Sequence, residues 1–328
     1  MTAIDVSIVV CTYNRGRLLR NALASLTALE TEGNFRYEVV AIDNASTDDT
    51  GQVIEEAARN SPVPVRGVRE PRAGVACARN RGIREARGPW IAFFDDDQVA
   101  DPRWLIELLA MARQAQARCA GGANRLLLPQ GGPDQLSPVC RTMLGEAVGS
   151  ERPRRYCRKA AFGTGNLLIH RSVFAEVGAF DESLHESGED TDLFRRLCTA
   201  KIDAWYTPEA VVYHVIPGYR LKDDYLRWRS LRVGGTLARR NRQDWGRVMF
   251  VPVVVARLGQ ALVLHVPRLL WARLRRAEGQ TLGARCLLWS AQGYLRFALS
   301  FMAPKLFGQQ RFFSQLEFRT ERQRFAGG

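Results

Sequence analysis

Residues 90–97, which read WIAFFDDD, join an apolar strand signal to three consecutive carboxylates. The apolar run at 90–94 is typical of a strand that is buried on both faces of a sheet. Asp95, Asp96 and Asp97 follow at the carboxyl end of that strand, where open α/β sheets bind their ligands. Adjacent carboxylates repel one another unless a cation offsets the repulsion, and their oxygen atoms suit Mg²⁺ or Mn²⁺. We therefore expect a metal site here, because the alternative, a solvated acidic turn, rarely follows a buried strand.

Strand and helix signals alternate on both sides of this segment. Short apolar runs rich in β-branched residues indicate buried strands, and apolar residues at helical spacing follow each run. The strands are predicted at residues 6–11, 37–42, 63–68 and 90–94, and the helices at residues 15–29, 49–59, 75–86 and 102–117. Such alternation predicts an α/β fold with a doubly wound, mainly parallel sheet and helices on both faces.

The pattern changes after residue 128. Residues 129–159 contain several Pro and Gly and show no period, and a loop of that length inside a compact domain is usually functional. Shorter strand and helix signals continue to residue 214, and a long basic helix is predicted at 221–242. We expect three segments, which are residues 1–128, 129–220 and 221–328.

Positive charge is concentrated in the last of these segments. The 328-residue chain has a net charge of +13, and residues 221–328 hold 20 Lys and Arg against 6 Asp and Glu. The rest of the chain is close to neutral. A basic segment of this kind indicates a polyanionic partner, either nucleic acid or an anionic membrane surface.

Two apolar helical segments, at 248–276 and 282–307, lie within the basic region. Each carries Arg and Gln along one face, which predicts amphipathic helices that lie in a membrane interface. Packing on the rest of the protein is the first alternative. Spanning the membrane is the second, and it is disfavoured because a central Arg costs about 2.5–3.5 kcal/mol on insertion.

Cysteine usage and phosphate-loop patterns exclude several classes of protein. The seven cysteines form no CxxC pair, which argues against a zinc ribbon. The first residues carry no signal-peptide pattern, so a reducing cytoplasm is expected. The first strand is followed by no GxGxxG, and the chain has no GxxxxGK[ST], which disfavours dinucleotide oxidoreductases and P-loop NTPases.

Polar residues also follow the first two predicted strands. Thr12, Tyr13 and Asn14 come after the first strand, and Asp43 and Asn44 come after the second. These residues share one rim of the sheet with the acidic triplet, where helix N-termini also point. Tyr13 can stack on a base, and Asp43 can accept the imide N–H of a pyrimidine. The alternative for each is a plain cap or turn residue.

The ordered set of motifs resembles the inverting glycosyltransferases of family 2, whose fold is called GT-A. The matching segments are TYNR at 12–15, DNASTD at 43–48, GVACARNRG at 74–82, DDD at 95–97, GTGN at 163–166 and GEDTDL at 188–193. The resemblance extends over residues 6–234 and implies direct displacement of a nucleoside diphosphate from a sugar by an acceptor hydroxyl. It implies that residues 1–128 bind the nucleotide sugar and that 129–220 bind the acceptor and hold the base. The charge and the amphipathic patterns predict separately that 221–328 form a basic helical section at the membrane.

The resemblance also implies roles for individual residues. Asp190 is the expected base, with Glu189 second, although the same segment also has the pattern of an acidic helix N-terminus. Asp95, Asp97 and His214 are the expected ligands of Mg²⁺ or Mn²⁺; a surface histidine is the alternative for His214. The expected donor-binding residues are Thr12, Tyr13, Asn14, Asp43, Asn44, Arg79, Asp95, Asp96, Arg229 and Arg232, and a solvated basic face is the alternative for the arginines of the 221–242 helix.

The expected partners follow from these assignments. They are a nucleotide-diphospho-sugar donor, a hydroxyl acceptor that is lipid-linked or a cell-surface polysaccharide precursor, and an anionic membrane, with the protein peripheral at the inner face; no nucleic acid is expected. A nucleotidyltransferase on a similar sheet is one alternative, but its Gly-rich loop is replaced here by TYNRGR at 12–17. A non-enzymatic basic protein that binds membrane or nucleic acid is another, and it leaves the aligned carboxylates unexplained.

Overall fold

The computed structural model describes residues 3–129, 136–156, 162–184 and 188–307 of the chain. It forms two compact units. We call Met1–Arg125 with Ala147–Val215 the sheet unit, and Leu126–Glu146 with Ile216–Gly328 the helical unit. These bounds differ from the three predicted segments, because both predicted halves of the sheet belong to one unit and residues 126–146 group with the C-terminal helices.

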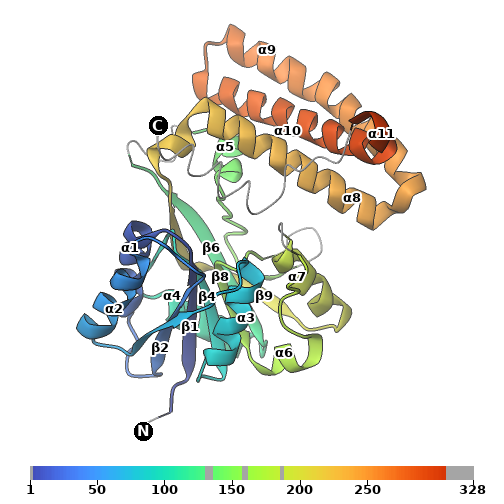
Figure 1. The fold of residues 1–328 in the computed structure, drawn as a ribbon. Helices are drawn as coiled ribbons and strands as arrows, with labels where there is room; N and C mark the ends of the chain where they lie inside the picture. The colour runs from blue at the N-terminus through green and yellow to red at the C-terminus, as the bar shows by residue number, and fades with distance from the viewer. Residues whose placement is uncertain (1–2, 130–135, 157–161, 185–187, 308–328) are drawn as a thin grey trace. The chain divides into compact units, whose positions relative to one another are not determined.

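One mixed sheet forms the centre of the sheet unit (Figure 1). Four parallel strands in the order β3-β2-β1-β4 are followed by β8, β6, β9 and β5, and β7 pairs with β9. The strands β8 and β6 extend the sheet in antiparallel pairs, as do β5 and β7 on β9. The bounds are β1 Val6–Thr12, β2 Tyr37–Asp43, β3 Val65–Arg69, β4 Trp90–Asp95, β5 Gln98–Ala100, β6 Cys119–Leu127, β7 Arg154–Arg155, β8 Asn166–His170 and β9 Ala204–Val215.

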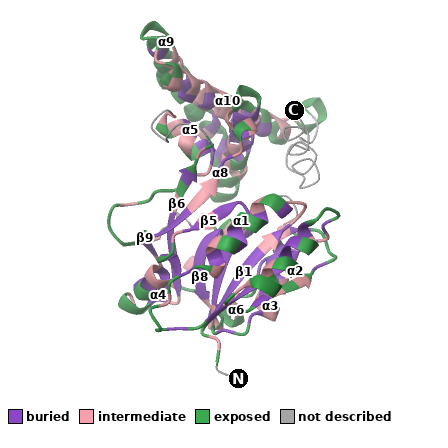
Figure 2. Cartoon of the chain, turned by 90° about the vertical axis from the view of Figure 1, so that its left-hand side faces the viewer, coloured by how far each residue is buried: buried purple, intermediate pink, exposed green. Residues whose placement is uncertain are grey.

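Helices cover both faces of the sheet. Successive residues of its central strands point to opposite sides, so each of these strands contributes apolar side chains to both faces. Ile8 and Val10 of β1 belong to one apolar cluster, whereas Val9 between them belongs to the other. Figure 2 shows these strands largely in the colour of buried residues. The first cluster contains residues of α1 (Gly16–Thr27), α2 (Thr50–Asn60) and α4 (Trp104–Gln114), and the second contains residues of α3 (Val75–Glu85), α6 (Ser172–Val177) and α7 (Glu189–Thr199). The α/β fold with its helices on both faces is therefore confirmed.

The strand β6 was not predicted, and neither was the short β5. The sequence of β6 is CAGGANRLL, which lacks the apolar run of the parallel strands. Its two glycines are needed for close packing: a Cβ on Gly122 would lie 1.9 Å from the carbonyl oxygen of Ala210, and one on Gly121 2.7 Å from the Tyr156 hydroxyl. The 129–159 region, expected to be a loop, contains the short helix α5 (Pro138–Met143) and β7 among its described residues.

The helical unit is built around α8 (Asp223–Gln260) and α10 (Glu278–Met302), which lie side by side (Figure 1). The helical backbone of α8 is broken by a kink at Gly246, which has φ +69° and ψ −178°. A Cβ on Gly234 would lie 1.8 Å from the Ser290 carbonyl oxygen, and one on Gly293 2.0 Å from that of Leu231. The two backbones therefore touch at positions that only glycine can occupy. The remaining elements are the 3₁₀ turn η2 (Gly218–Leu221), the π-helical turn η3 (Ala261–His265), α9 (Val266–Leu274) and α11 (Pro304–Phe307).

The two apolar segments of the helical unit differ in exposure. Tyr294, Phe297 and Ala298 of α10 are buried against α8, whereas Phe301 and Met302 at the end of α10 are exposed. In contrast, large apolar side chains from the end of α8 to the end of α9 are exposed. We call this set the apolar surface, and it comprises Val248, Met249, Val251, Val255, Leu262, Val263, Leu264, Leu270, Trp271 and Leu274. Within the described residues, Asp223–Leu274 is the one helical stretch long and apolar enough to cross a membrane.

Candidate active site

Three of the predicted polar strand ends lie side by side at the carboxyl edge of the parallel strands. In the strand register, Thr12 at the end of β1 lies beside Asp43 at the end of β2. On the other side of β1, Cys11 lies beside Asp95 at the end of β4. The edge on which open α/β sheets bind ligands therefore carries the three polar strand ends that the sequence predicted.

Side-chain hydrogen bonds join the loops along this edge. The Thr12 hydroxyl donates to the Asp96 carboxylate at 2.9 Å. The Asn14 side chain accepts from the Thr47 backbone N–H at 2.7 Å, and the Asn14 N–H donates to the Ser46 hydroxyl at 3.0 Å. Thr12 and Asn14 thus hold the first loop against the end of β4 and against the second loop.

Asp43 and Asn44 shape the second loop and the loop before α3. The Asp43 carboxylate accepts from the Ser46 N–H, three residues on, at 2.8 Å, which closes the turn after β2. The Asn44 amide donates to the Arg72 carbonyl at 2.7 Å and accepts from the Gly74 N–H at 2.9 Å. Both side chains are buried, so the turn role that the sequence left open for Asp43 is present in the structure.

The three acidic residues after β4 lie in different surroundings. Asp96 is buried and is bound by Arg15 as well as by Thr12. One Asp97 carboxylate oxygen lies 3.3 Å from a guanidinium nitrogen of Arg15 and 3.4 Å from Nε2 of His214. Asp95 is half-buried, and desolvation raises its pKa to about 6, a shift that Arg79 opposes. From the sequence, Arg15 was only one residue of the TYNR motif. In the structure its guanidinium offsets the negative charge of Asp96 and Asp97.

The structure brings together two of the three side chains that were expected to bind a metal, Asp97 and His214. Among the residues that the structure describes, no three His, Cys, Asp or Glu side chains are grouped so as to hold a metal ion. Asp97 and His214 are adjacent, but Asp95 is not gathered with them. Mg²⁺ and Mn²⁺ sites of this kind commonly use one or two protein ligands and complete their coordination with water and substrate phosphates. The pair formed by Asp97 and His214 therefore fits such an ion.

The orientation of Asp95 depends on Gly165, which sequence reasoning did not single out. A Cβ on Gly165 would lie 2.2 Å from Oδ2 of Asp95, so the carboxylate rests against bare backbone. The next residue, Asn166, is buried, accepts from the Trp104 indole N–H at 2.8 Å and donates to the Ala210 carbonyl at 3.0 Å. The GTGN segment is thus a support for the acidic strand end.

Arg79 lies between the acidic end of β4 and the start of α7. Its side chain is buried, and Nη1 lies 2.6 Å from Oε1 of Glu189. Nη2 lies 3.8 Å from Oδ1 of Asp95, and the guanidinium carbon stands 5.4 Å from the centre of the Phe180 ring. Its cation therefore connects the acidic strand end to the acidic start of α7, and the expected contact of Arg79 with the nucleotide stays a prediction.

Asp190 and Glu189 begin α7 after Gly188, whose φ of +104° suits glycine. Desolvation raises the pKa of Asp190, the Glu189 charge adds to that shift, and the Arg79 cation opposes it. The Asp190 carboxylate accepts from the Thr191 N–H at 2.7 Å. A carboxylate in these surroundings is suited to accept a proton near neutral pH.

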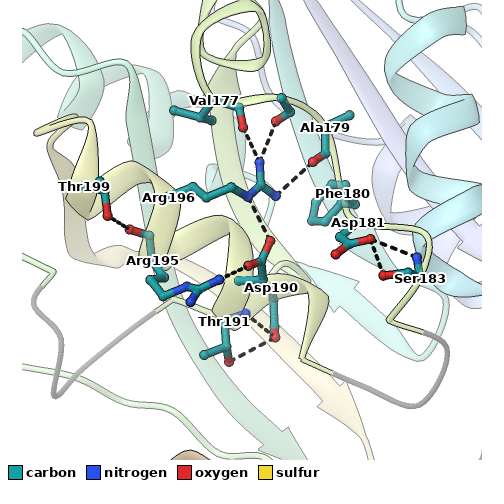
Figure 3. A network of polar contacts seen from close by, with 12 residues as sticks. Val177, Ala179, Phe180, Asp181, Ser183, Asp190, Thr191, Arg195, Arg196 and Thr199 are labelled. Carbon is teal, nitrogen blue, oxygen red and sulfur yellow. Dashed lines mark hydrogen bonds and ion pairs between the residues drawn. The ribbon is translucent and has the colours of Figure 1, made fainter. Parts of the chain in front are cut away.

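Arg196 anchors the helix that carries these carboxylates (Figure 3). Its guanidinium donates to the carbonyl oxygens of Val177, Gly178 and Ala179, at 3.0 Å for Gly178 and 2.9 Å for Ala179. Its Nε donates to Asp192 at 2.8 Å. The N-terminal turn of α7 is therefore fixed to the segment that precedes it.

Arg229 and Arg232 belong to the helical unit. The Arg229 Nε donates to the Met143 carbonyl at 3.2 Å, and burial lowers the pKa of Arg229. Arg232 is buried, with its guanidinium carbon 5.0 Å from the centre of the Trp228 ring. Both arginines pack within their unit, and their contact with a donor diphosphate stays a prediction.

Comparisons with known proteins identify the family of the chain. Residues 7–173, half of the chain, match the family described as Glycosyl transferase family 2. The succinoglycan biosynthesis protein ExoM of Rhizobium meliloti (strain 1021) is 30% identical over 240 residues, which cover 72% of this chain and 75% of that protein. The validoxylamine A glucosyltransferase of Streptomyces hygroscopicus subsp. jinggangensis (strain 5008) is 30% identical over 217 residues, 58% of this chain but only 51% of that protein.

Solved structures agree on the fold. The mannosyltransferase PcManGT from Pyrobaculum calidifontis, in complex with GDP-Man and Mn²⁺, matches with a TM-score of 0.60 at 16% identity. The match covers 90% of this chain and 88% of that one. The sheet therefore has the GT-A arrangement that the motifs predicted. The chain belongs to glycosyl transferase family 2 and is a glycosyltransferase.

Proposed function

We propose that this glycosyltransferase moves a sugar from a nucleotide-diphospho-sugar to an acceptor hydroxyl with inversion at the anomeric carbon. Asp190 takes the proton from the hydroxyl as the oxygen attacks, and the nucleoside diphosphate departs from the opposite side. The observation that supports this most directly is the ion-pair network through Arg79, which joins Glu189 beside the base to Asp95 at the donor edge. These ion pairs would keep the base at a fixed position relative to the donor.

The donor lies along the carboxyl edge of β1, β2 and β4 in this proposal. Thr12, Tyr13, Asn14, Asp43 and Asn44 form its nucleoside end, where the loops are already tied together. Asp95 and Asp96 face the ribose and diphosphate. Residues 1–128 would then serve the donor, and residues 129–220 the acceptor.

Asp97 and His214 would hold a Mg²⁺ or Mn²⁺ ion against the donor diphosphate. When bound, the ion supplies positive charge where negative charge develops on the leaving group. The chain's own residues do the rest: Arg15 neutralises Asp96 and Asp97, and Asp190 accepts the proton. The Mn²⁺ in the complex of PcManGT with GDP-Man gives an analogy for this use of metal.

The acceptor in this proposal is lipid-linked or a cell-surface polysaccharide precursor, presented at the inner face of the cell membrane. The support is the apolar surface of the helical unit together with its surplus of arginines. Both features suit a peripheral helix in an anionic interface. The similarity to a protein of succinoglycan biosynthesis fits a polysaccharide pathway.

A donor screen tests the proposal. The full chain is incubated with a panel of nucleotide sugars and Mg²⁺ or Mn²⁺, with and without chelator, and release of the nucleoside diphosphate is measured. We expect metal-dependent release from one donor class and, with an added acceptor, a product of inverted configuration by NMR. A product of retained configuration would contradict the mechanism, and full activity in chelator would contradict the metal assignment.

A further inference from the structure

We propose that Arg79 is a positioning residue, which acts on the transfer step by binding Glu189, the carboxylate next to Asp190, and by linking it to Asp95. This inference rests on the proposed role of Asp190 as the base. It adds a residue whose effect is felt in turnover and not in donor affinity.

The first support is the enclosure of the Arg79 guanidinium. The residue is 8% exposed and Glu189 7%, so their 2.6 Å contact is a buried ion pair. The Phe180 ring covers the guanidinium at 5.4 Å. A long cationic side chain enclosed in this way has few rotamers available, and it fixes the carboxylate that it binds.

The second support is the neighbouring residue of α3, which fixes the same segment. The Asn80 amide donates to the Phe180 carbonyl and accepts from the Phe180 N–H, both at 2.9 Å. Arg79 and Asn80 are neighbours on α3. Asn80 therefore holds Phe180, whose ring covers the ion pair, and Arg79 holds the Glu189 carboxylate at the start of α7. The contact with Glu189 spans 110 residues of sequence, so it brings the two halves of the site together.

The third support is electrostatic. Glu189 precedes Asp190, and its charge raises the pKa of the Asp190 carboxyl, as does desolvation. The Arg79 cation acts in the opposite direction, and the Thr191 N–H and hydroxyl also favour the ionised form. Loss of Arg79 removes the one cation in this set. The base then binds its proton more tightly, and the Glu189 side chain is free to turn toward it.

The test uses the full chain and the variants Arg79→Gln, Arg79→Lys, Glu189→Gln and the double variant Arg79→Gln/Glu189→Gln. Arg81→Gln is the matched control, because Arg81 lies on the same helix and pairs with Glu85 at 2.9 Å, away from the site. For each protein kcat, the donor KM and the pH profile of turnover are measured, and circular dichroism checks the fold. Active wild-type enzyme is the precondition, so failure of the proposed function is seen first and separately.

We expect Arg79→Gln to lower kcat by about 10²-fold, the effect of a misplaced catalytic group, while the donor KM stays within a few-fold. The acid limb of its pH profile moves to higher pH, and Arg79→Lys recovers part of kcat. Since Arg79 acts through Glu189, the double variant is no slower than the slower single variant. Arg81→Gln behaves as wild type.

Three results would overturn the proposal. One is a raised donor KM with unchanged kcat in Arg79→Gln, which would make Arg79 a donor ligand. Another is multiplication of the two single effects in the double variant, which would make the residues independent. The last is an unmoved acid limb. If Arg79→Gln fails to fold, Arg79→Lys and Glu189→Gln carry the same comparison, because each keeps the volume of the side chain it replaces.

Discussion

Asp95, Asp96 and Asp97 are three identical side chains that the structure uses in three ways. Asp96 is bound by Thr12 and Arg15 and supports the rim, and Asp97 stands beside His214. Asp95 faces Gly165 and Arg79. The sequence predicted correctly that all three lie at the end of a strand, because a buried apolar strand cannot continue through consecutive charged residues. Their separate surroundings depend on residues distant in the chain, which local patterns do not contain.

Gly165→Ala tests the contact between Asp95 and the GTGN segment. The new Cβ would approach Oδ2 of Asp95 to 2.2 Å, so the carboxylate must move. We expect the fold to persist and transfer activity to fall roughly 10-fold or more, since a displacement near 1 Å is costly at a reacting site. Gly163→Ala is the control, because a Cβ there meets nothing within 4 Å. Equal activities of the two variants would exclude a role for this contact.

At the scale of elements, the parallel strands and their helices were predictable and the added strands were not. Strands β1, β2 and β4 are continuous apolar runs because both of their faces are covered. In β6, Gly121 and Gly122 replace apolar residues because neighbouring groups approach too closely for a side chain. Only the folded sheet reveals that requirement. The ion pair of Arg79 with Glu189 escaped prediction for the same reason, because it joins α3 to α7.

The close contact of α8 and α10 predicts opposite effects for two glycine substitutions. In Gly293→Ala the new methyl group would meet the Leu231 backbone at 2.0 Å, and overpacking of this kind costs roughly 1–3 kcal/mol. Gly259→Ala, also in a helix, meets nothing within 4 Å and stabilises by about 0.5–1 kcal/mol through helix propensity. Urea unfolding of both variants measures the difference. A Gly293→Ala protein as stable as Gly259→Ala would refute the close helix contact.

At the scale of the whole molecule, charge and exposed apolar area coincide in the helical unit. The sequence predicted two equivalent interfacial helices, but α10 is buried against α8 while the apolar surface lies on the end of α8, η3 and α9. The polar stripes of the two segments look alike in sequence. The partner helix that distinguishes them becomes visible only in the folded unit.

The apolar surface predicts reversible binding to anionic membranes. Each cation near such a surface contributes about 1 kcal/mol, and burial of apolar side chains adds to it. We expect the full chain to float with phosphatidylcholine vesicles that contain phosphatidylglycerol, to dissociate at high salt, and to lose binding in Leu270→Glu/Leu274→Glu. Binding unaffected by that double variant would exclude the apolar surface. Retention in both high salt and carbonate would indicate a spanning helix.

The most direct measurement of the central claim is the turnover of Asp190→Asn beside its donor affinity. Asparagine keeps the shape of the side chain and cannot accept the proton, so turnover should fall by about 10²–10⁴-fold. Donor binding by calorimetry should stay near the wild-type value. Desolvation raises the pKa of the Asp190 carboxyl, so wild-type turnover should decline as the pH falls through this raised pKa and the base becomes protonated. The residual turnover of Asp190→Asn should lack this decline. Near-normal turnover, or loss of donor binding with turnover preserved at saturation, would contradict the account.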